Sequence, residues 1–226
     1  MKTKVIIFGN GPSAEVMAKI IMSIKSFEFI GFTVDQKYIG KKKIFGYPVY
    51  NFENVLKKFS NKKFQIFISV GYSDMNSLRE KIYKRIKKYG YKCPNIIHPS
   101  TNLPKDLKLG DNNFIMNDVH IHPIVKIGNN NFIWSGAIIS HHVEVGNNCW
   151  FTSGSSVAGK TIIGNNCFFG INSTIVNNVF IGNNCFIGAR ALVSKNLKNK
   201  SVVISPADTK HKLNSKQFTI FLNNNF

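Results

Sequence analysis

The sequence predicts two domains, a small parallel α/β domain followed by a triangular parallel β-helix. Over the first ninety or so residues, short apolar runs alternate with segments of helical periodicity, which is typical of alternating strands and helices. Past Ile97 the pattern changes to a repeat of eighteen residues with a finer period of six. A length of 226 residues and a hydrophobic content of 43% suit one medium or two small globular domains.

The α/β domain is expected over residues 1–95. Apolar runs bounded by turn residues predict its strands, and apolar residues recurring every three or four positions predict its helices. In chain order we expect a strand at 4–8, a helix at 13–24, a strand at 29–34, a helix at 52–59, a strand at 64–70 and a basic amphipathic helix at 75–89. This alternation favours a parallel sheet.

The β-helix is expected over residues 96–195, with a C-terminal tail at 196–226. An aliphatic residue followed by glycine recurs every eighteen residues, at Leu109, Ile127, Val145, Ile163 and Ile181. Every sixth residue from Ile97 to Val193 is apolar, and a small residue follows four positions later in most cases. This period predicts three short faces per coil and coils stacked about 4.8 Å apart, with Gly and Asn at the tight corners.

The same period explains most of the cysteines. Cys149, Cys167 and Cys185 are eighteen residues apart at an inward position, so they are expected to form a row inside the prism as reduced thiols. A row does not converge on a metal ion, and no metal is expected. Trp150 is expected to stack in a ladder between Phe132 and Phe168, and it also remains a candidate for lining a site.

The formal net charge of +19 favours polyanionic partners such as nucleic acid, anionic membranes or phosphate-rich small molecules. The chain is also rich in Asn, Ile, Phe and Lys throughout, so a compositional background is an equally good interpretation. The lysines are scattered and no nucleic-acid motif occurs, which argues against nucleic-acid binding. No apolar run of eighteen residues and no signal-peptide pattern occurs, so we expect a cytoplasmic protein without membrane insertion.

A glycine-rich loop, Gly9 to Ala14, follows the first strand and opens the first helix, and Asp35 lies 26 residues beyond Gly9. This pattern matches the GxGxxG/A fingerprint of dinucleotide-binding domains. The domain is too short for the half that binds nicotinamide, which argues against an NAD-dependent oxidoreductase. A helix N-terminus holds the diphosphate of other nucleotides equally well.

The hexapeptide coils, the α/β domain before them and the segment from Ser135 to Gly146 together resemble the nucleotide-amino-sugar N-acetyltransferases and the related sialic acid O-acetyltransferases. The resemblance covers nearly the whole chain, including Ile97–Ser100 and Val203–Ala207. It implies a Rossmann-like N-terminal domain, a left-handed parallel β-helix and a homotrimer. It also implies acetyl-CoA as cosubstrate between neighbouring prisms, and a nucleotide-linked amino sugar held partly by the α/β domain, for surface glycan synthesis such as lipopolysaccharide or capsule. N-acetylation of such a sugar is favoured, and O-acetylation of a sugar or sialic acid remains the alternative.

His141 matches the family's catalytic histidine, and acyl transfer to an amine needs a base that titrates near neutrality. In similar enzymes an acidic residue follows this histidine, whereas here that position is His142. Glu144 is the nearest carboxylate and a weaker candidate for the partner. Gly159 lies eighteen residues beyond His141 and matches a family glycine beside the thioester, so its N–H is a candidate oxyanion donor.

The resemblance also implies binding residues. Positions that contact coenzyme A in similar enzymes correspond to Trp150, Gly159, Ile171 and Ala189, and nearby cations that face its phosphates or solvent are Arg190, Lys195, Lys198 and Lys200. Nucleotide-binding positions carry over to Gly11, Pro12, Ser13, Asp35 and Gly71, with Pro12 replacing a small residue. A metal site at His120 and His122 is disfavoured because no third ligand lies nearby.

Overall fold

The computed structural model describes residues 2–206, 212–217 and 219. The first part of the chain folds as a five-stranded sheet in the order β3-β4-β2-β1-β5, parallel except for β3. Its elements are β1 (Thr3–Phe8), α1 (Pro12–Ser23), β2 (Phe27–Val34), the 3-10 helix η1 (Gln36–Tyr38), β3 (Lys43–Ile44), β4 (Tyr47–Asn51), α2 (Phe52–Lys58), β5 (Phe64–Ile68) and α3 (Ser77–Lys88). The predicted alternation of strands and helices is confirmed. Strands β3 and β4 were not among the predicted strands.

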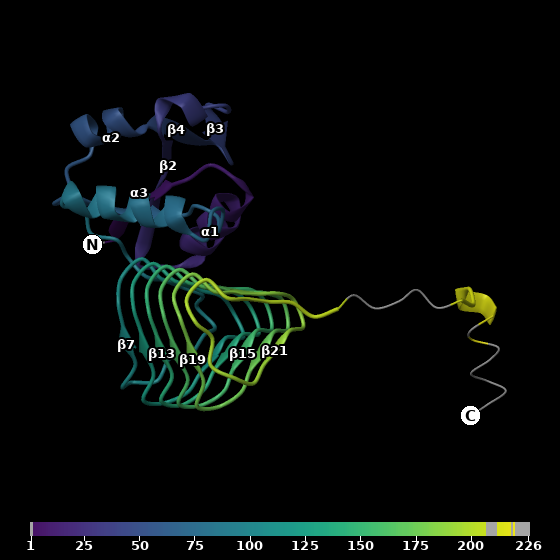
Figure 1. The fold of residues 1–226 in the computed structure, drawn as a ribbon. Coiled ribbons are helices and arrows are strands. Elements are labelled where there is room, and N and C mark those ends of the chain that lie inside the picture. The colour runs from purple at the N-terminus through teal and green to yellow at the C-terminus, as the bar shows by residue number, and fades with distance from the viewer. Residues whose placement is uncertain (1, 207–211, 218, 220–226) are drawn as a thin grey trace.

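The second part is a prism of stacked coils with three parallel sheets (Figure 1). One sheet lies under the N-terminal domain and is called the covered face. It consists of β6 (Ile96–Ile97), β8 (Phe114–Ile115), β11 (Phe132–Ile133), β14 (Trp150–Phe151), β17 (Phe168–Phe169), β20 (Phe186–Ile187) and β22 (Val202–Val203). The β12 face consists of β9 (His120–Ile121), β12 (Ile138–Ile139), β15 (Ser156–Val157), β18 (Thr174–Ile175) and β21 (Leu192–Val193). The β13 face consists of β7 (Lys108–Leu109), β10 (Lys126–Ile127), β13 (Glu144–Val145), β16 (Ile162–Ile163) and β19 (Phe180–Ile181).

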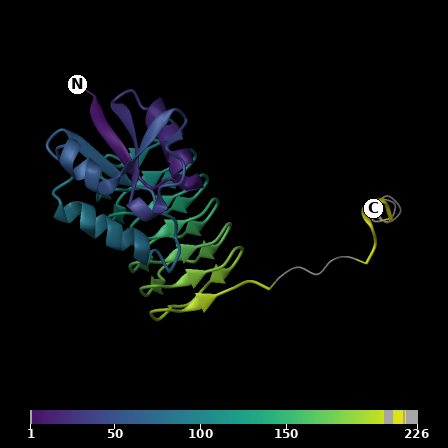
Figure 2. The ribbon, with the colours of Figure 1, turned by 90° about the horizontal axis from the view of Figure 1, so that it is seen from above.

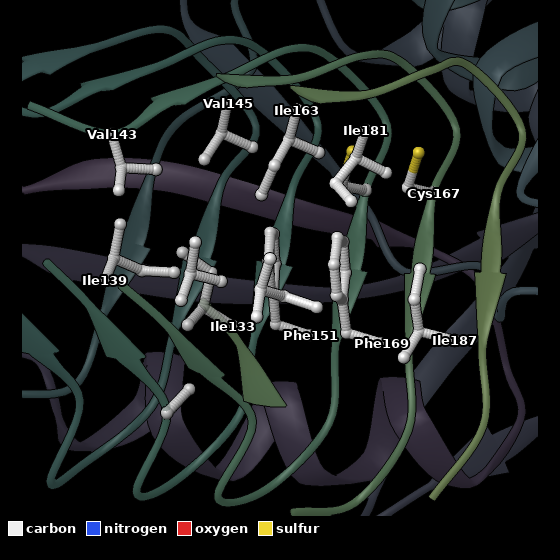
Figure 3. Packing of buried hydrophobic residues seen from close by; sticks show 14 of the residues in the cluster. Ile133, Ile139, Val143, Val145, Phe151, Ile163, Cys167, Phe169, Ile181 and Ile187 are labelled. Atoms are coloured by element: carbon white, nitrogen blue, oxygen red, sulfur yellow. The ribbon is translucent and has the colours of Figure 1, made fainter. Parts of the chain in front are cut away.

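The core of the prism consists of vertical rows of like residues, as the period of six predicts. One row runs through Ile133, Phe151, Phe169 and Ile187, all fully buried (Figure 3). The rings of Phe151 and Phe169 stack with centroids 4.4 Å apart. Because each coil repeats the same inward positions, burial in one coil fixes the register of the next.

The cysteine row is confirmed. Cys149, Cys167 and Cys185 are buried and free. Each thiol donates to a backbone carbonyl in the following coil, and Cys167 Sγ lies 3.1 Å from the Gly182 oxygen. These thiols therefore fill the prism as small packing groups.

The N-terminal domain sits on the covered face (Figures 1 and 2). Most outward residues of that face are aromatic, and Phe132 stacks on Phe67 of β5 with centroids 5.8 Å apart. Phe114, Trp150 and Phe168 belong to the same buried cluster as the side chains of β1, β2 and α1. The expected ladder is confirmed, since Trp150 pairs with Phe132 on one side and Phe168 on the other.

The strands of the prism extend beyond residue 195, where the tail was expected to begin. Leu197 bridges to Ile181, and β22 pairs with β20. The last coil therefore reaches Val203. Residues 207–211, 218 and 220–226 of the expected tail lie outside the described residues. Within the described part of the chain, no helix is long and apolar enough to cross a membrane.

Candidate active site

His141 lies at the corner where the β12 face turns into the β13 face, and its side chain is exposed. Its Nδ1 lies 3.1 Å from Nδ1 of His142, and the two rings meet edge to face with centroids 5.3 Å apart. His142 adopts the left-handed conformation at this corner, with φ of 60°. The two imidazoles therefore form a hydrogen-bonded pair in which one Nδ1 donates and the other accepts.

Gly159 occupies the same corner one coil further along and is buried. A Cβ atom built on Gly159 would lie 2.5 Å from Cε1 and 2.8 Å from Nε2 of His141, so only glycine allows this ring position. The backbone of the two coils is joined by a hydrogen bond from Lys160 N to the His141 oxygen. In the described residues the Gly159 N–H has no protein acceptor. The expected adjacency of His141 and Gly159 is thus present.

Glu144 is not the partner of His141. Its carboxylate forms an ion pair with Lys126 on the neighbouring coil of the β13 face. No other carboxylate of the described chain is hydrogen-bonded to His141. The partner at this corner is His142.

The positions expected to contact coenzyme A divide into two groups. Ile171 and Ala189 lie one above the other at the edge where the covered face meets the β12 face, and both are exposed. Gly159 lies at the opposite edge of the β12 face. These three residues therefore border one open face of the prism.

The expectation for Trp150 as a coenzyme A contact is corrected. Trp150 belongs to the covered face and is 4% exposed beneath the N-terminal domain. Its ring contacts Tyr72 and Trp134, and it lies 5.2 Å from the Arg79 guanidinium carbon. It is therefore part of the interface between the domains and does not border the β12 face.

The glycine-rich loop opens onto a pocket of about 480 Å³ at the carboxyl edge of the N-terminal sheet. The expected residues Gly11, Pro12, Ser13, Asp35 and Gly71 all line it. Gly11 is the N-cap of α1 without a side-chain cap, and Pro12 occupies the first turn. The unpaired N–H groups of a helix start and the helix dipole favour an anion here.

Helix α3 supplies a wall of this pocket that the sequence did not reveal. Leu78, Lys81, Ile82 and Arg85 line it, and Arg85 donates to both oxygens of Asp35 at 2.9 and 3.2 Å. The signal in the sequence was the basic amphipathic pattern of 75–89, which did not indicate which cations face a ligand.

The opposite side of α3 fastens the domain to the prism. Arg79 is fully buried and donates to the carbonyl oxygens of Asn148 and Cys149, and burial lowers its pKa to about 9. Glu80 accepts a hydrogen bond of 2.8 Å from Asn166, the end of a ladder of asparagine side chains through successive coils. One face of α3 thus lines the pocket while the other is fixed to the prism.

The pocket and His141 lie on different sides of the molecule. The N-terminal domain sits on the covered face (Figure 1), whereas His141, between β12 and β13, lies at the corner of the other two faces. The cross-section of the prism therefore separates them within one chain.

Two family models match the chain. The PglD N-terminal domain matches residues 4–86, and the bacterial transferase hexapeptide repeats match residues 106–140 and 160–195. The chain belongs to the hexapeptide-repeat transferases with a PglD-type N-terminal domain. Among curated proteins, no sequence matches this chain.

Solved structures of such transferases share the fold. The acetyltransferase domain of PglB from Neisseria gonorrhoeae FA1090 is 20% identical, with a TM-score of 0.82, covering 92% of this chain and all of that one. A histidine-to-alanine variant of GDP-perosamine N-acetyltransferase from Caulobacter crescentus, in complex with CoA and GDP-perosamine, is 24% identical with a TM-score of 0.81, covering 92% of this chain and 97% of that one. The expected architecture, an α/β domain followed by a left-handed β-helix, is confirmed.

Two other basic residues lie at the corner of His141, with His122 one coil earlier and Lys160 one coil later. His120 and His122 flank buried Ile121 and point to solvent. Arg190 follows Ala189 at the edge of the β12 face. Within the described residues, no group of three His, Cys, Asp or Glu side chains is arranged to hold a metal ion.

Proposed function

We propose that the protein transfers acetyl from acetyl-CoA to the amino group of a nucleotide-linked deoxyamino sugar, with His141 as general base. The observation that carries the proposal is the contact of the His141 ring with Gly159, whose N–H has no acceptor among the described residues, at the edge of an open prism face. The pocket at the glycine-rich loop supports a nucleotide ligand. Structural neighbours bound to CoA and GDP-perosamine support the same pair of substrates.

The steps of acetyl transfer follow from the positions of His141 and Gly159 at this corner of the prism. The amine attacks the thioester carbonyl and must lose a proton, which Nε2 of His141 accepts. The negative charge that develops on the carbonyl oxygen lies next to the Gly159 N–H, a donor fixed in place before the reaction. Collapse of the tetrahedral intermediate releases the CoA thiolate, which takes the proton from the imidazolium.

We assign to His142 the role of orienting the His141 ring. For Nε2 to accept a proton, Nδ1 of His141 must carry its hydrogen and donate it to Nδ1 of His142 at 3.1 Å. His142 therefore acts in its neutral form, with its own hydrogen on Nε2. It positions the ring but supplies no negative charge to stabilise the imidazolium.

We further propose that the active protein is a homotrimer. Because the pocket and His141 lie on different sides of one chain, a sugar held in the pocket would meet the His141 of a neighbouring copy. Exposed apolar residues on the two uncovered faces, Ile162, Phe180 and Leu192, support packing against another prism. Light scattering should give three times the chain mass, and a monomer would remove this part of the proposal.

We propose that acetyl-CoA binds along the β12 face, between Gly159 and the edge formed by Ile171 and Ala189. A cytoplasmic location is proposed from four free, buried cysteines and the use of acetyl-CoA. The product would serve the synthesis of a surface glycan such as lipopolysaccharide or capsule.

The test is release of the CoA thiol from acetyl-CoA with UDP-, TDP- and GDP-linked 3-amino and 4-amino deoxysugars. We expect release with one amino sugar and its loss in His141→Asn. Release only with a hydroxyl acceptor such as sialic acid would replace N-acetylation by O-acetylation. Silence with every acceptor would contradict the proposal.

A further inference from the structure

Asp35 lies where a nucleotide-binding α/β domain holds a ribose. It follows β2, which neighbours β1 in the sheet, and β1 leads into the glycine-rich loop. Asp35 and the N-terminus of α1 therefore line the same pocket. In dinucleotide-binding units, a carboxylate after the second strand accepts hydrogen bonds from ribose hydroxyls while the diphosphate lies at the helix start.

Arg85 fixes the Asp35 carboxylate but occupies only some of its hydrogen-bond acceptor sites. The guanidinium donates one hydrogen bond to each oxygen of Asp35, at 2.9 and 3.2 Å. A carboxylate has about four lone-pair sites, so two sites are left to accept hydroxyl groups. The Asp35 side chain is 34% exposed, which keeps these sites within reach of a ligand.

Arg85 is itself held in place. Its guanidinium carbon lies 5.2 Å from the ring centre of Phe8 and 4.9 Å from that of Phe52. A planar fork held between two rings leaves the carboxylate little freedom to turn. The acceptor is thus oriented before a ligand arrives, which reduces the entropy lost on binding.

The charge around Asp35 also suits a diphosphate. The charged residues that line the pocket are Asp35, Lys37, Lys81 and Arg85, one anion against three cations. Without Arg85, the Asp35 carboxylate would repel a diphosphate at the start of α1. With Arg85, the pocket keeps an acceptor for hydroxyl groups and a net positive charge.

We propose that Asp35, held by Arg85, reads the ribose 2′-hydroxyl, so that the pocket takes a ribonucleoside diphosphate in preference to a 2′-deoxyribonucleoside diphosphate. The inference rests on the proposed function, in which this pocket holds the nucleotide of the sugar substrate. It narrows the substrate class to sugars linked to UDP or GDP and disfavours those linked to dTDP. Removing the hydroxyl leaves a charged acceptor site unpaired.

The test compares nucleotides that differ only at this hydroxyl, by calorimetric titration of UDP against 2′-deoxy-UDP and of GDP against 2′-deoxy-GDP. A hydrogen bond to a charged, partly exposed group predicts about 10-fold tighter binding of the ribonucleotide within the pair whose base fits. In Asp35→Ala the preference should fall to about 2-fold or less. In Arg85→Lys, which keeps the charge but loses the fork, it should be intermediate.

Because each preference is a ratio measured on one protein, a general loss of stability in a variant does not imitate the result. Lys88→Gln removes a cation from an exposed position of the same helix and should leave the ratio unchanged. Equal binding of ribonucleotides and 2′-deoxynucleotides, or equal use of dTDP-linked sugars, would overturn this inference and leave acetyl transfer standing. If no nucleotide binds, the proposed function fails and the inference fails with it.

Discussion

The imidazole of His141 lies directly against Gly159 of the next coil, at a distance that leaves no room for a side chain. A methyl group on Gly159 would meet the ring atoms Cε1 and Nε2 and push the ring out of the corner. The contact joins the proposed base to the proposed oxyanion donor, so changing one displaces the other.

Gly159→Ala is therefore expected to lower kcat by about 10- to 100-fold, because displacing a catalytic group by about 1 Å costs this much. The unfolding free energy should change little, since the backbone of Gly159 is not in the left-handed region. Asn177→Ala, at the same corner one coil further along, is the matched control and should keep kcat within 2-fold. Wild-type activity in Gly159→Ala would remove the contact from the mechanism.

His142 provides a second prediction. His142→Ala removes the acceptor for Nδ1 of His141 and should lower kcat by about 10-fold with little change in either KM. His142→Glu places a carboxylate beside the imidazolium that forms in the transition state, and it should recover or exceed the wild-type kcat. Steady-state kinetics of both variants decide the point. Equal activity of all three proteins would show that His141 needs no partner on this side.

The place of Trp150 can be tested in the same assay. Because Trp150 lies under the N-terminal domain, Trp150→Phe should leave the KM for acetyl-CoA within 2-fold of wild type. Ile171→Asp, on the open edge of the β12 face, should raise that KM by about 10-fold or more, because it puts a charge against the apolar part of the cosubstrate. The reverse pattern would place acetyl-CoA on the covered face.

The lowered pKa of Glu80 predicts how the unfolding free energy depends on pH. Burial alone would raise the pKa of Glu80, but hydrogen bonds from Lys84 and Asn166 outweigh it and hold the pKa below the usual 4.5. A carboxyl with a lowered folded pKa stabilises the protein above pH 4.5, and this contribution is lost as the pH falls through the folded value. Glu80→Gln should therefore reduce the unfolding free energy by about 1 kcal/mol at pH 7 and by less at pH 3.

Urea unfolding at the two pH values measures the effect, and Glu28→Gln, on an exposed strand position, is the control. The same loss at both pH values in Glu80→Gln would mean that the carboxylate charge does not contribute.

How far the sequence predicts this structure depends on the range of each contact. The coils were predictable because every inward position recurs after a fixed number of residues. For the same reason, His141 and Gly159, eighteen apart, could be placed side by side. The final coil was not predicted because its period shortens to sixteen residues, from Ile181 to Leu197 and from Phe186 to Val202.

Contacts without a period were not predictable. Every face of the prism has the same inward alternation, and only the outward row separates the faces, being mostly aromatic on the covered face and mostly polar or aliphatic on the other two. The period placed Trp150 in the aromatic ladder that the structure shows, whereas the expected coenzyme A contact rested on the family resemblance. Arg85 and Asp35 are fifty residues apart and belong to different elements, so only the folded sheet and α3 bring them together.

The role of His141 as general base is tested most directly by the rate of acetyl transfer in a single turnover, measured for the wild-type protein and for His141→Asn with the accepted amino sugar. We expect a fall of about 100-fold or more in the variant, with the Kd values for acetyl-CoA and the nucleotide sugar unchanged within about 3-fold. An undiminished rate in His141→Asn would contradict general-base catalysis by His141 and leave only the fold.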